Sequence, residues 1–80
     1  MTSGEFIDAV TNEAARAGAI HAPMHSPHEA LGVIREEYAE FEQRVYQHNP
    51  VKGRDCRPQM REELIQLAAM CLRAIRDLDL

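Results

Sequence analysis

The feature that most constrains this chain is a run of apolar residues recurring every three or four positions from Ala30 to Val45. That spacing is the 3.6-residue repeat of an amphipathic helix. Just before it, Ser26-Pro27-His28-Glu29 places serine at the N-cap, proline at the first helical position and glutamate three residues after the cap. Asn49-Pro50 ends the pattern. The sequence therefore predicts a helix from about Pro27 to His48.

A shorter apolar pattern precedes this helix. Thr2 and Glu5 have the spacing of a capping box, and apolar residues follow at helical intervals. Gly18 is expected to end this first helix, because a residue without a Cβ adopts the left-handed C-terminal conformation at little cost. The stretch from Ala19 to His25 contains Pro23 and is expected to be a loop.

A third helix is predicted after a loop from Asn49 to Arg57, in which proline, glycine and aspartate favour turns. It begins near Pro58 and runs almost to the C-terminus. Its apolar residues form two adjacent stripes, one of Met60, Leu64, Leu67, Cys71, Ala74 and Leu78, the other of Ile65, Ala68, Leu72 and Ile75. An apolar face of this width predicts burial on two sides, most simply through self-association.

These patterns predict an all-α fold for residues 1–80 as a single domain, because no run alternates strictly between apolar and polar residues. The second and third helices are expected to form an antiparallel hairpin, and two such hairpins would make a four-helix bundle. A homodimer or homotetramer is therefore expected. A chain of 80 residues buries too little surface to be more than marginally stable without a partner.

Charge and composition exclude several functions. The net charge of −4 argues against a general nucleic-acid-binding protein. No apolar run approaches the roughly 20 residues that span a bilayer, so no membrane partner is expected. The N-terminal residues have no signal-peptide pattern, and two cysteines are too few for a disulfide framework. A cytoplasmic location is the resulting expectation.

Three histidines and one cysteine have simple structural interpretations. His21, His25 and His28 lie close together, but no Cys or Asp beside them completes a zinc site, so they are expected at the surface or at helix caps. Cys71 lies on the apolar stripe and is expected to be a small core residue.

The candidate chemistry lies in carboxylates at the edges of the apolar stripes. Glu37 and Glu40 are three residues apart, so both project from nearly the same side of the predicted helix. Glu63 and Gln66 have the same spacing on the third helix, and antiparallel packing would bring the two pairs to one groove. Clustered carboxylates repel each other, and a hard divalent cation such as Mg²⁺ or Mn²⁺ would remove that repulsion. On spacing alone, an ordinary solvated helix face is the simpler interpretation.

The order of these residues adds a further argument. The run from His28 to Phe41, followed after a loop by Arg61-Glu-Glu-Leu-Ile-Gln-Leu-Ala-Ala-Met70, resembles the MazG-like all-α nucleotide pyrophosphohydrolases. The resemblance covers residues 26–80. It implies Mg²⁺-dependent cleavage of a nucleoside triphosphate to a monophosphate and pyrophosphate.

The resemblance also implies roles for individual residues. Glu37 and Glu40 match the family's E-x-x-E pair, and Glu63 matches the first member of its E-x-x-D pair. Gln66 stands where the family has aspartate; its amide oxygen can still ligate Mg²⁺ but carries no charge. Glu36 is assigned as the catalytic carboxylate that orients the attacking water.

Basic residues in and after the second loop leave two interpretations open. Lys52, Arg54, Arg57 and Arg61 are either a phosphate-binding clamp over the acidic groove or a solvated segment that pairs with acidic residues of the second helix. The function also has alternatives. A non-catalytic relative would use the same bundle for nucleotide binding or protein association, as Gln66 suggests, and the wide third-helix face also fits a structural subunit of a larger complex.

Overall fold

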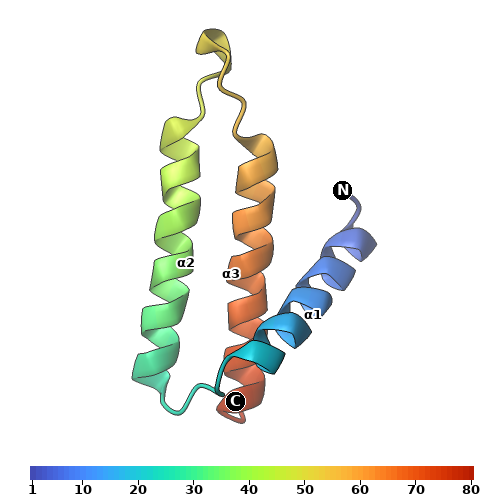
Figure 1. The fold of residues 1–80 in the computed structure, drawn as a ribbon, viewed down its shortest axis with the longest axis vertical. Coiled ribbons are helices and arrows are strands. Elements are labelled where there is room, and N and C mark those ends of the chain that lie inside the picture. The colour runs from blue at the N-terminus through green and yellow to red at the C-terminus, as the bar shows by residue number, and fades with distance from the viewer.

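A computed structural model describes residues 1–80 as three α-helices without a β-strand. Helix α1 spans Ser3–Ile20, α2 spans Pro27–Gln47 and α3 spans Arg57–Asp77, and a single 3₁₀ turn, η1, covers Pro50–Lys52 between α2 and α3. Helices α2 and α3 run antiparallel and side by side (Figure 1). The all-α class and the hairpin are therefore confirmed. No helix has the length and apolar character needed to cross a membrane.

The predicted starts of α1 and α2 are confirmed by their caps. The Thr2 side chain accepts a hydrogen bond from the Glu5 N–H, and the Glu5 carboxylate accepts one from the Thr2 N–H, as a capping box requires. Ser26 accepts from the Glu29 N–H at the start of α2. The Glu29 carboxylate, however, accepts from the His25 N–H instead of returning to Ser26. Both caps satisfy N–H groups that a helix start otherwise leaves unpaired.

The predicted end of α1 at Gly18 is wrong. The helix continues to Ile20, and the chain leaves it in an extended conformation at His21. Gly18 does not have a positive φ, so it does not serve as a left-handed cap. Proline disfavours helical geometry in the residue before it, and Pro23 therefore keeps Ala22 from extending α1.

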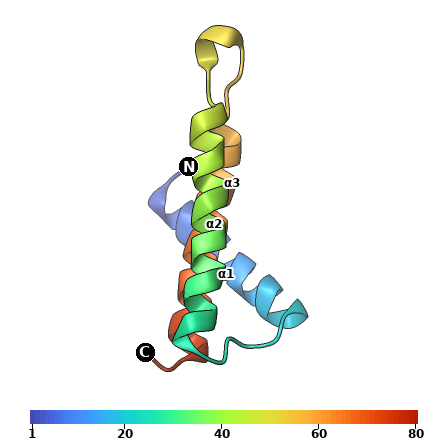
Figure 2. The same ribbon diagram turned by 90° about the vertical axis from the view of Figure 1, so that its left-hand side faces the viewer.

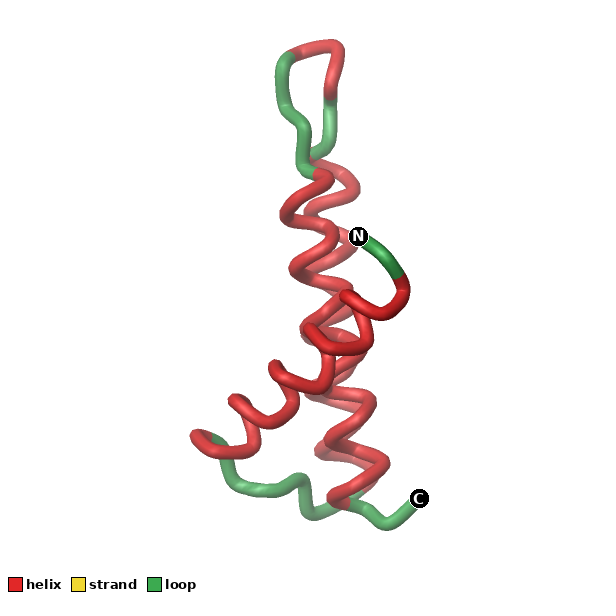
Figure 3. The backbone as a smooth tube through the Cα atoms, turned by 90° about the vertical axis from the view of Figure 1, so that its right-hand side faces the viewer, coloured by secondary structure: helices red, strands yellow, loops and turns green.

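Helix α3 is the centre of the fold. It packs against α2 on one side and α1 on another, whereas α1 and α2 do not pack against each other. Figures 2 and 3 show α1 crossing the α2–α3 hairpin obliquely, so that only α2 and α3 lie closely alongside each other. The molecule is elongated, with extents of 45 × 27 × 21 Å.

The core at this crossing is made mainly of small side chains. Its buried members are Ala14, Ala17, Met24, Ala30, Ala69, Met70 and Ala74. Alanine lets two helix backbones approach closely, but it buries little apolar area. Large apolar residues such as Ile7, Leu31 and Tyr38 remain more than half exposed in the single chain.

Cys71 is not a core residue, contrary to the sequence prediction. Its side chain is exposed and lines a shallow apolar groove between α2 and α3. The other residues of that groove are Leu31, Ile34, Arg35, Tyr38 and Leu67. Leu67 and Cys71 of that stripe therefore lie on a side of α3 that α1 does not cover, whereas Ala74 of the same stripe is buried in the core. The second stripe lies toward α1, where Ala68 and Leu72 line a shallow pocket with Phe6, Ile7 and Val10.

Candidate metal centre

Three of the predicted ligands come together between α2 and α3. One carboxylate oxygen each from Glu37, Glu40 and Glu63 lies within 4.8 Å of the other two. The first two residues are on successive turns of α2, and the antiparallel pairing of α3 brings Glu63 opposite them. The predicted meeting of the two helices at this point is thus observed, although exposed acidic groups also cluster in proteins that bind no ion.

Glu37 contributes a buried oxygen to this group, which we call the acidic cluster (Glu37, Glu40 and Glu63). Its Oε2 atom is buried and has no hydrogen-bond partner. Burial, together with the neighbouring charges of Glu40 and Glu63, raises the pKa of Glu37 to about 7. Burial and the proximity of Glu63 also raise the pKa of Glu40 above its usual range. The carboxylates of the cluster therefore repel one another when all three are ionised.

The raised pKa of Glu37 predicts a pH dependence of stability for the metal-free protein. The folded state holds the Glu37 proton more tightly than the unfolded chain does, so the free energy of unfolding falls as pH rises between about 4.5 and about 7. Melting temperatures measured in a chelating buffer at about pH 5 and about pH 8 check this, and Glu37→Gln is expected to reduce the difference between them. An equal difference in the variant would contradict the assignment to Glu37.

The acidic cluster meets the requirements of a hard divalent cation. All of its donors are carboxylate oxygens, which suit Mg²⁺ and Mn²⁺ better than zinc. The buried, unpartnered Glu37 oxygen is an acceptor in need of a positive charge. The three carboxylates of the acidic cluster therefore fit Mg²⁺ or Mn²⁺.

The predicted fourth ligand, Gln66, has a neighbour that sequence reasoning did not identify. It is half-buried on α3, and Glu13 of α1 lies beside it. The Arg16 guanidinium and, to a smaller degree, the Gln66 amide hold the pKa of Glu13 below its usual range. Because Gln66 interacts with α1, its role as a ligand stays a prediction.

A cleft of about 380 Å³ adjoins the acidic cluster. Glu36 and Glu37 both line it, so the carboxylate assigned to orient water and one assigned ligand share one opening. The rest of the wall is His21, Ala22, Met24, Glu29, Val33, Met70 and Arg73. A partly apolar cleft beside a charged centre suits a ligand with an apolar portion and a polar portion.

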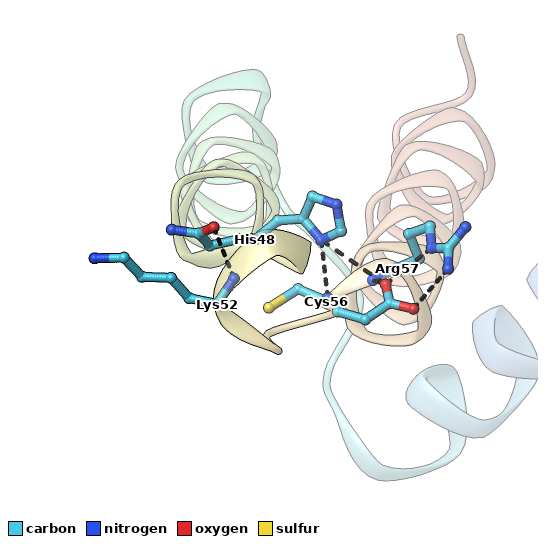
Figure 4. A network of polar contacts seen from close by, with 6 residues as sticks. His48, Lys52, Cys56 and Arg57 are labelled. Carbon is cyan, nitrogen blue, oxygen red and sulfur yellow. Dashed lines mark hydrogen bonds and ion pairs between the residues drawn. The ribbon is translucent and has the colours of Figure 1, made fainter.

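The four basic residues of the predicted phosphate clamp lie at or near the end of the hairpin that carries η1: Lys52, Arg54, Arg57 and Arg61. Their contacts differ. Two oxygens of Asp55 accept hydrogen bonds from Arg57 at 2.8 and 2.7 Å, and these bonds hold the pKa of Asp55 well below its usual range. Lys52 extends away from both helices (Figure 4). Arg54 pairs through its backbone with Asn49, and Arg61 contributes a weak attraction to Glu5. Their assignment as a phosphate clamp stays a prediction.

His48, at the end of α2, contacts two residues at the other end of the same loop. Its Nδ1 atom accepts a hydrogen bond from the Cys56 N–H at 3.0 Å and lies 3.8 Å from an Asp55 oxygen (Figure 4). From sequence alone, His48 is expected only as the end of the second helix. Its contact with Cys56 joins the C-cap of α2 to the N-cap of α3.

Arg44 makes a contact with the acidic cluster that sequence reasoning missed. Its Nε atom on α2 lies 3.5 Å from Glu63 Oε1 on α3. The available signal was its position four residues after Glu40, because residues four apart share a helix face. That spacing alone does not reveal a contact with α3.

No protein-family model matches the chain, and no curated protein or solved structure matches it either. The observations that bear on function are therefore the acidic cluster, the adjoining cleft and the sequence resemblance.

Proposed function

We propose that this chain is a Mg²⁺-dependent nucleoside triphosphate pyrophosphohydrolase of the MazG-like type, with Mn²⁺ as an alternative ion. The observation that carries the proposal is the acidic cluster, where two helices contribute three carboxylates within 4.8 Å and one buried oxygen has no partner. Its residues are those that the family resemblance assigns to the metal. The cleft beside Glu36 and Glu37 supports a nucleotide as the ligand.

Each group of residues has a part in the proposed reaction. Glu37, Glu40 and Glu63, with Gln66 as a neutral fourth ligand, would hold the cation. When bound, the cation would supply charge neutralisation on the phosphates and activation of the attacking water. Glu36 orients that water toward the α-phosphorus and accepts its proton. A new P–O bond forms, the bond between the α-phosphorus and the bridging oxygen breaks, and the electron pair leaves with pyrophosphate.

The test is product analysis over a panel of ribo- and deoxyribonucleoside triphosphates with Mg²⁺. The proposal predicts nucleoside monophosphate and pyrophosphate in equal amounts from at least one triphosphate. Release of orthophosphate alone would indicate a different bond cleavage. No product from any triphosphate would favour the second candidate.

The second candidate is a non-catalytic MazG-like module for nucleotide binding or protein association. Gln66 favours this second candidate, because its amide is neutral and interacts with Glu13 of α1. Gln66→Asp distinguishes the two candidates, because a degenerate enzyme is expected to gain pyrophosphate release when the fourth charge is restored. A binding module would gain none.

We propose further that two chains associate through the groove of Leu31, Ile34, Tyr38, Leu67 and Cys71 to form a four-helix bundle from α2 and α3. The groove is almost entirely apolar, and Leu31 and Tyr38 are 51% and 54% exposed. Pairing two such faces buries apolar area that the alanine-rich core of one chain lacks. A tetramer would use the exposed apolar residues of α1 in addition.

Self-association is tested by one charge substitution. The protein is expected to have a solution mass near twice or four times 9.1 kDa, and Leu31→Glu is expected to shift it toward 9.1 kDa. Val51→Glu is the matched control, since Val51 is 95% exposed at the hairpin tip, outside the groove. Sedimentation equilibrium measures both variants. A wild-type monomer at micromolar concentration would contradict the bundle.

A further inference from the structure

The ion pair between Arg44 and Glu63 is the only one made by the acidic cluster. Among the ion pairs of the chain, no other basic side chain lies within 4.0 Å of Glu37, Glu40 or Glu63. Arg44 comes from α2 and Glu63 from α3, so this ion pair joins the two helices beside the cluster. It is thus the positive charge that partly balances the three carboxylates.

This contact is loose. The Nε–Oε1 distance of 3.5 Å is longer than an ordinary charge-assisted hydrogen bond, and the Arg44 side chain is 38% exposed. The Nη1 atom donates to Gln47 Oε1 at 3.2 Å, on the same helix. Ion pairs of this kind contribute little stability, so a stronger cation can replace the guanidinium at small cost.

We infer that Arg44 is a tethered counter-ion of Glu63 in the metal-free protein, which gives way to the divalent cation and then binds a phosphate oxygen of the ligand. The inference rests on the proposed cation site. A dication neutralises more of the cluster's charge than one guanidinium does, and it acts on all three carboxylates at once. Once Glu63 is held by the ion, Arg44 keeps its hydrogen bond to Gln47, and its remaining N–H donors beside the cluster are available to a ligand.

The released guanidinium is suited to phosphate. Its planar array of N–H donors matches two phosphate oxygens, and its stem is anchored one helical turn from Glu40. Arg57, by contrast, already donates from Nε and Nη2 to the Asp55 carboxylate, which neutralises its charge in a two-point ion pair. Arg44 is therefore better placed for phosphate contact than Arg57 of the predicted clamp.

The two roles of Arg44 predict opposite effects of one substitution. Without phosphate, Arg44→Gln removes a competitor and is expected to tighten Mn²⁺ binding about two- to fivefold. With Mn²⁺ bound, the same variant is expected to weaken inorganic triphosphate binding about tenfold or more, because a charged hydrogen-bond partner is lost. A general change in fold would not move the two affinities in opposite directions. The loss of one positive charge anywhere on the chain would do so weakly, so the effects of Arg44→Gln must exceed those of Arg76→Gln, which loses the same charge far from the cluster.

The experiment titrates Mn²⁺ and then inorganic triphosphate into wild type, Arg44→Gln, Arg44→Lys, Arg76→Gln and Glu63→Gln, by electron paramagnetic resonance and calorimetry. Arg76→Gln is the matched control, since it removes the same charge about 20 Å farther along α3 than Glu63. Arg44→Lys keeps the charge but lacks the planar fork, so it is expected to lose triphosphate affinity while binding Mn²⁺ more like wild type.

The outcomes separate this inference from the proposed function. If wild type and Arg44→Gln have the same affinity for Mn²⁺ and also the same affinity for triphosphate, the inference is overturned. If Glu63→Gln then still loses Mn²⁺ binding, the cation site remains supported. Weaker Mn²⁺ binding in Arg44→Gln would also overturn it, because Arg44 would then support the site. Absence of Mn²⁺ binding in wild type would overturn both proposals.

Discussion

Replacing Glu63 with glutamine is expected to reduce Mg²⁺-dependent pyrophosphate release about 100-fold or more. Glu63 is the only member of the acidic cluster that α3 contributes. Glutamine keeps the shape of the side chain and one oxygen acceptor but removes the charge that holds a dication. The loss is therefore electrostatic, and the variant is expected to fold like the wild type because the mutual repulsion of the carboxylates falls.

Glu62→Gln is the matched control for this prediction. It makes the same chemical change one position earlier on α3, at an exposed residue outside the acidic cluster. Initial rates of pyrophosphate release at saturating Mg²⁺ measure both variants. Retention of wild-type activity in Glu63→Gln, or an equal loss in both variants, would remove Glu63 from the proposed reaction.

The largest expected effect on stability comes from Arg73. This residue is 7% exposed on α3, and its Nη2 atom donates to the Ala22 carbonyl at 3.0 Å. It also lies 3.9 Å from Asp77 Oδ2, which accepts the Met24 N–H at 2.9 Å. Arg73 and Asp77 together fasten the α1–α2 linker to the C-terminal end of α3.

Arg73→Met is expected to lower the free energy of unfolding by about 2–3 kcal/mol, because it removes a charged hydrogen-bond donor and leaves a part-buried carbonyl without a partner. Methionine keeps the apolar stem, so the change reports mainly on the polar contacts. Urea denaturation at fixed protein concentration measures it, with the exposed Arg76→Met as the control. A difference of less than about 0.5 kcal/mol between the two variants would contradict this account of the linker.

The elements of the fold that local chemistry controls were predictable from sequence. The caps at Thr2 and Ser26 and the breaks around Asn49-Pro50 are determined by nearby residues, and the structure has them as expected. The end of α1 was mispredicted because a mid-helix glycine resembles a cap glycine. The proline that limits the helix, Pro23, lies five residues farther on.

Features that depend on packing between helices were only partly predictable. The meeting of Glu37, Glu40 and Glu63 followed from two short spacings and an antiparallel hairpin, so it could be expected. Cys71 is exposed because α1 covers a different side of α3. The periodicity of apolar residues does not specify which side of a helix its neighbour covers. Likewise, Arg44 and Arg73 acquire partners from distant segments, which no local pattern reveals.

The most direct test of the central claim, that the acidic cluster is a divalent-cation site, is the melting temperature of wild type and Glu40→Gln with and without Mg²⁺. A ligand that binds only the folded state raises its stability, so Mg²⁺ is expected to raise the wild-type melting temperature. Removal of one cluster charge in Glu40→Gln is expected to abolish that rise. Melting temperatures indifferent to Mg²⁺ in both proteins would contradict the claim.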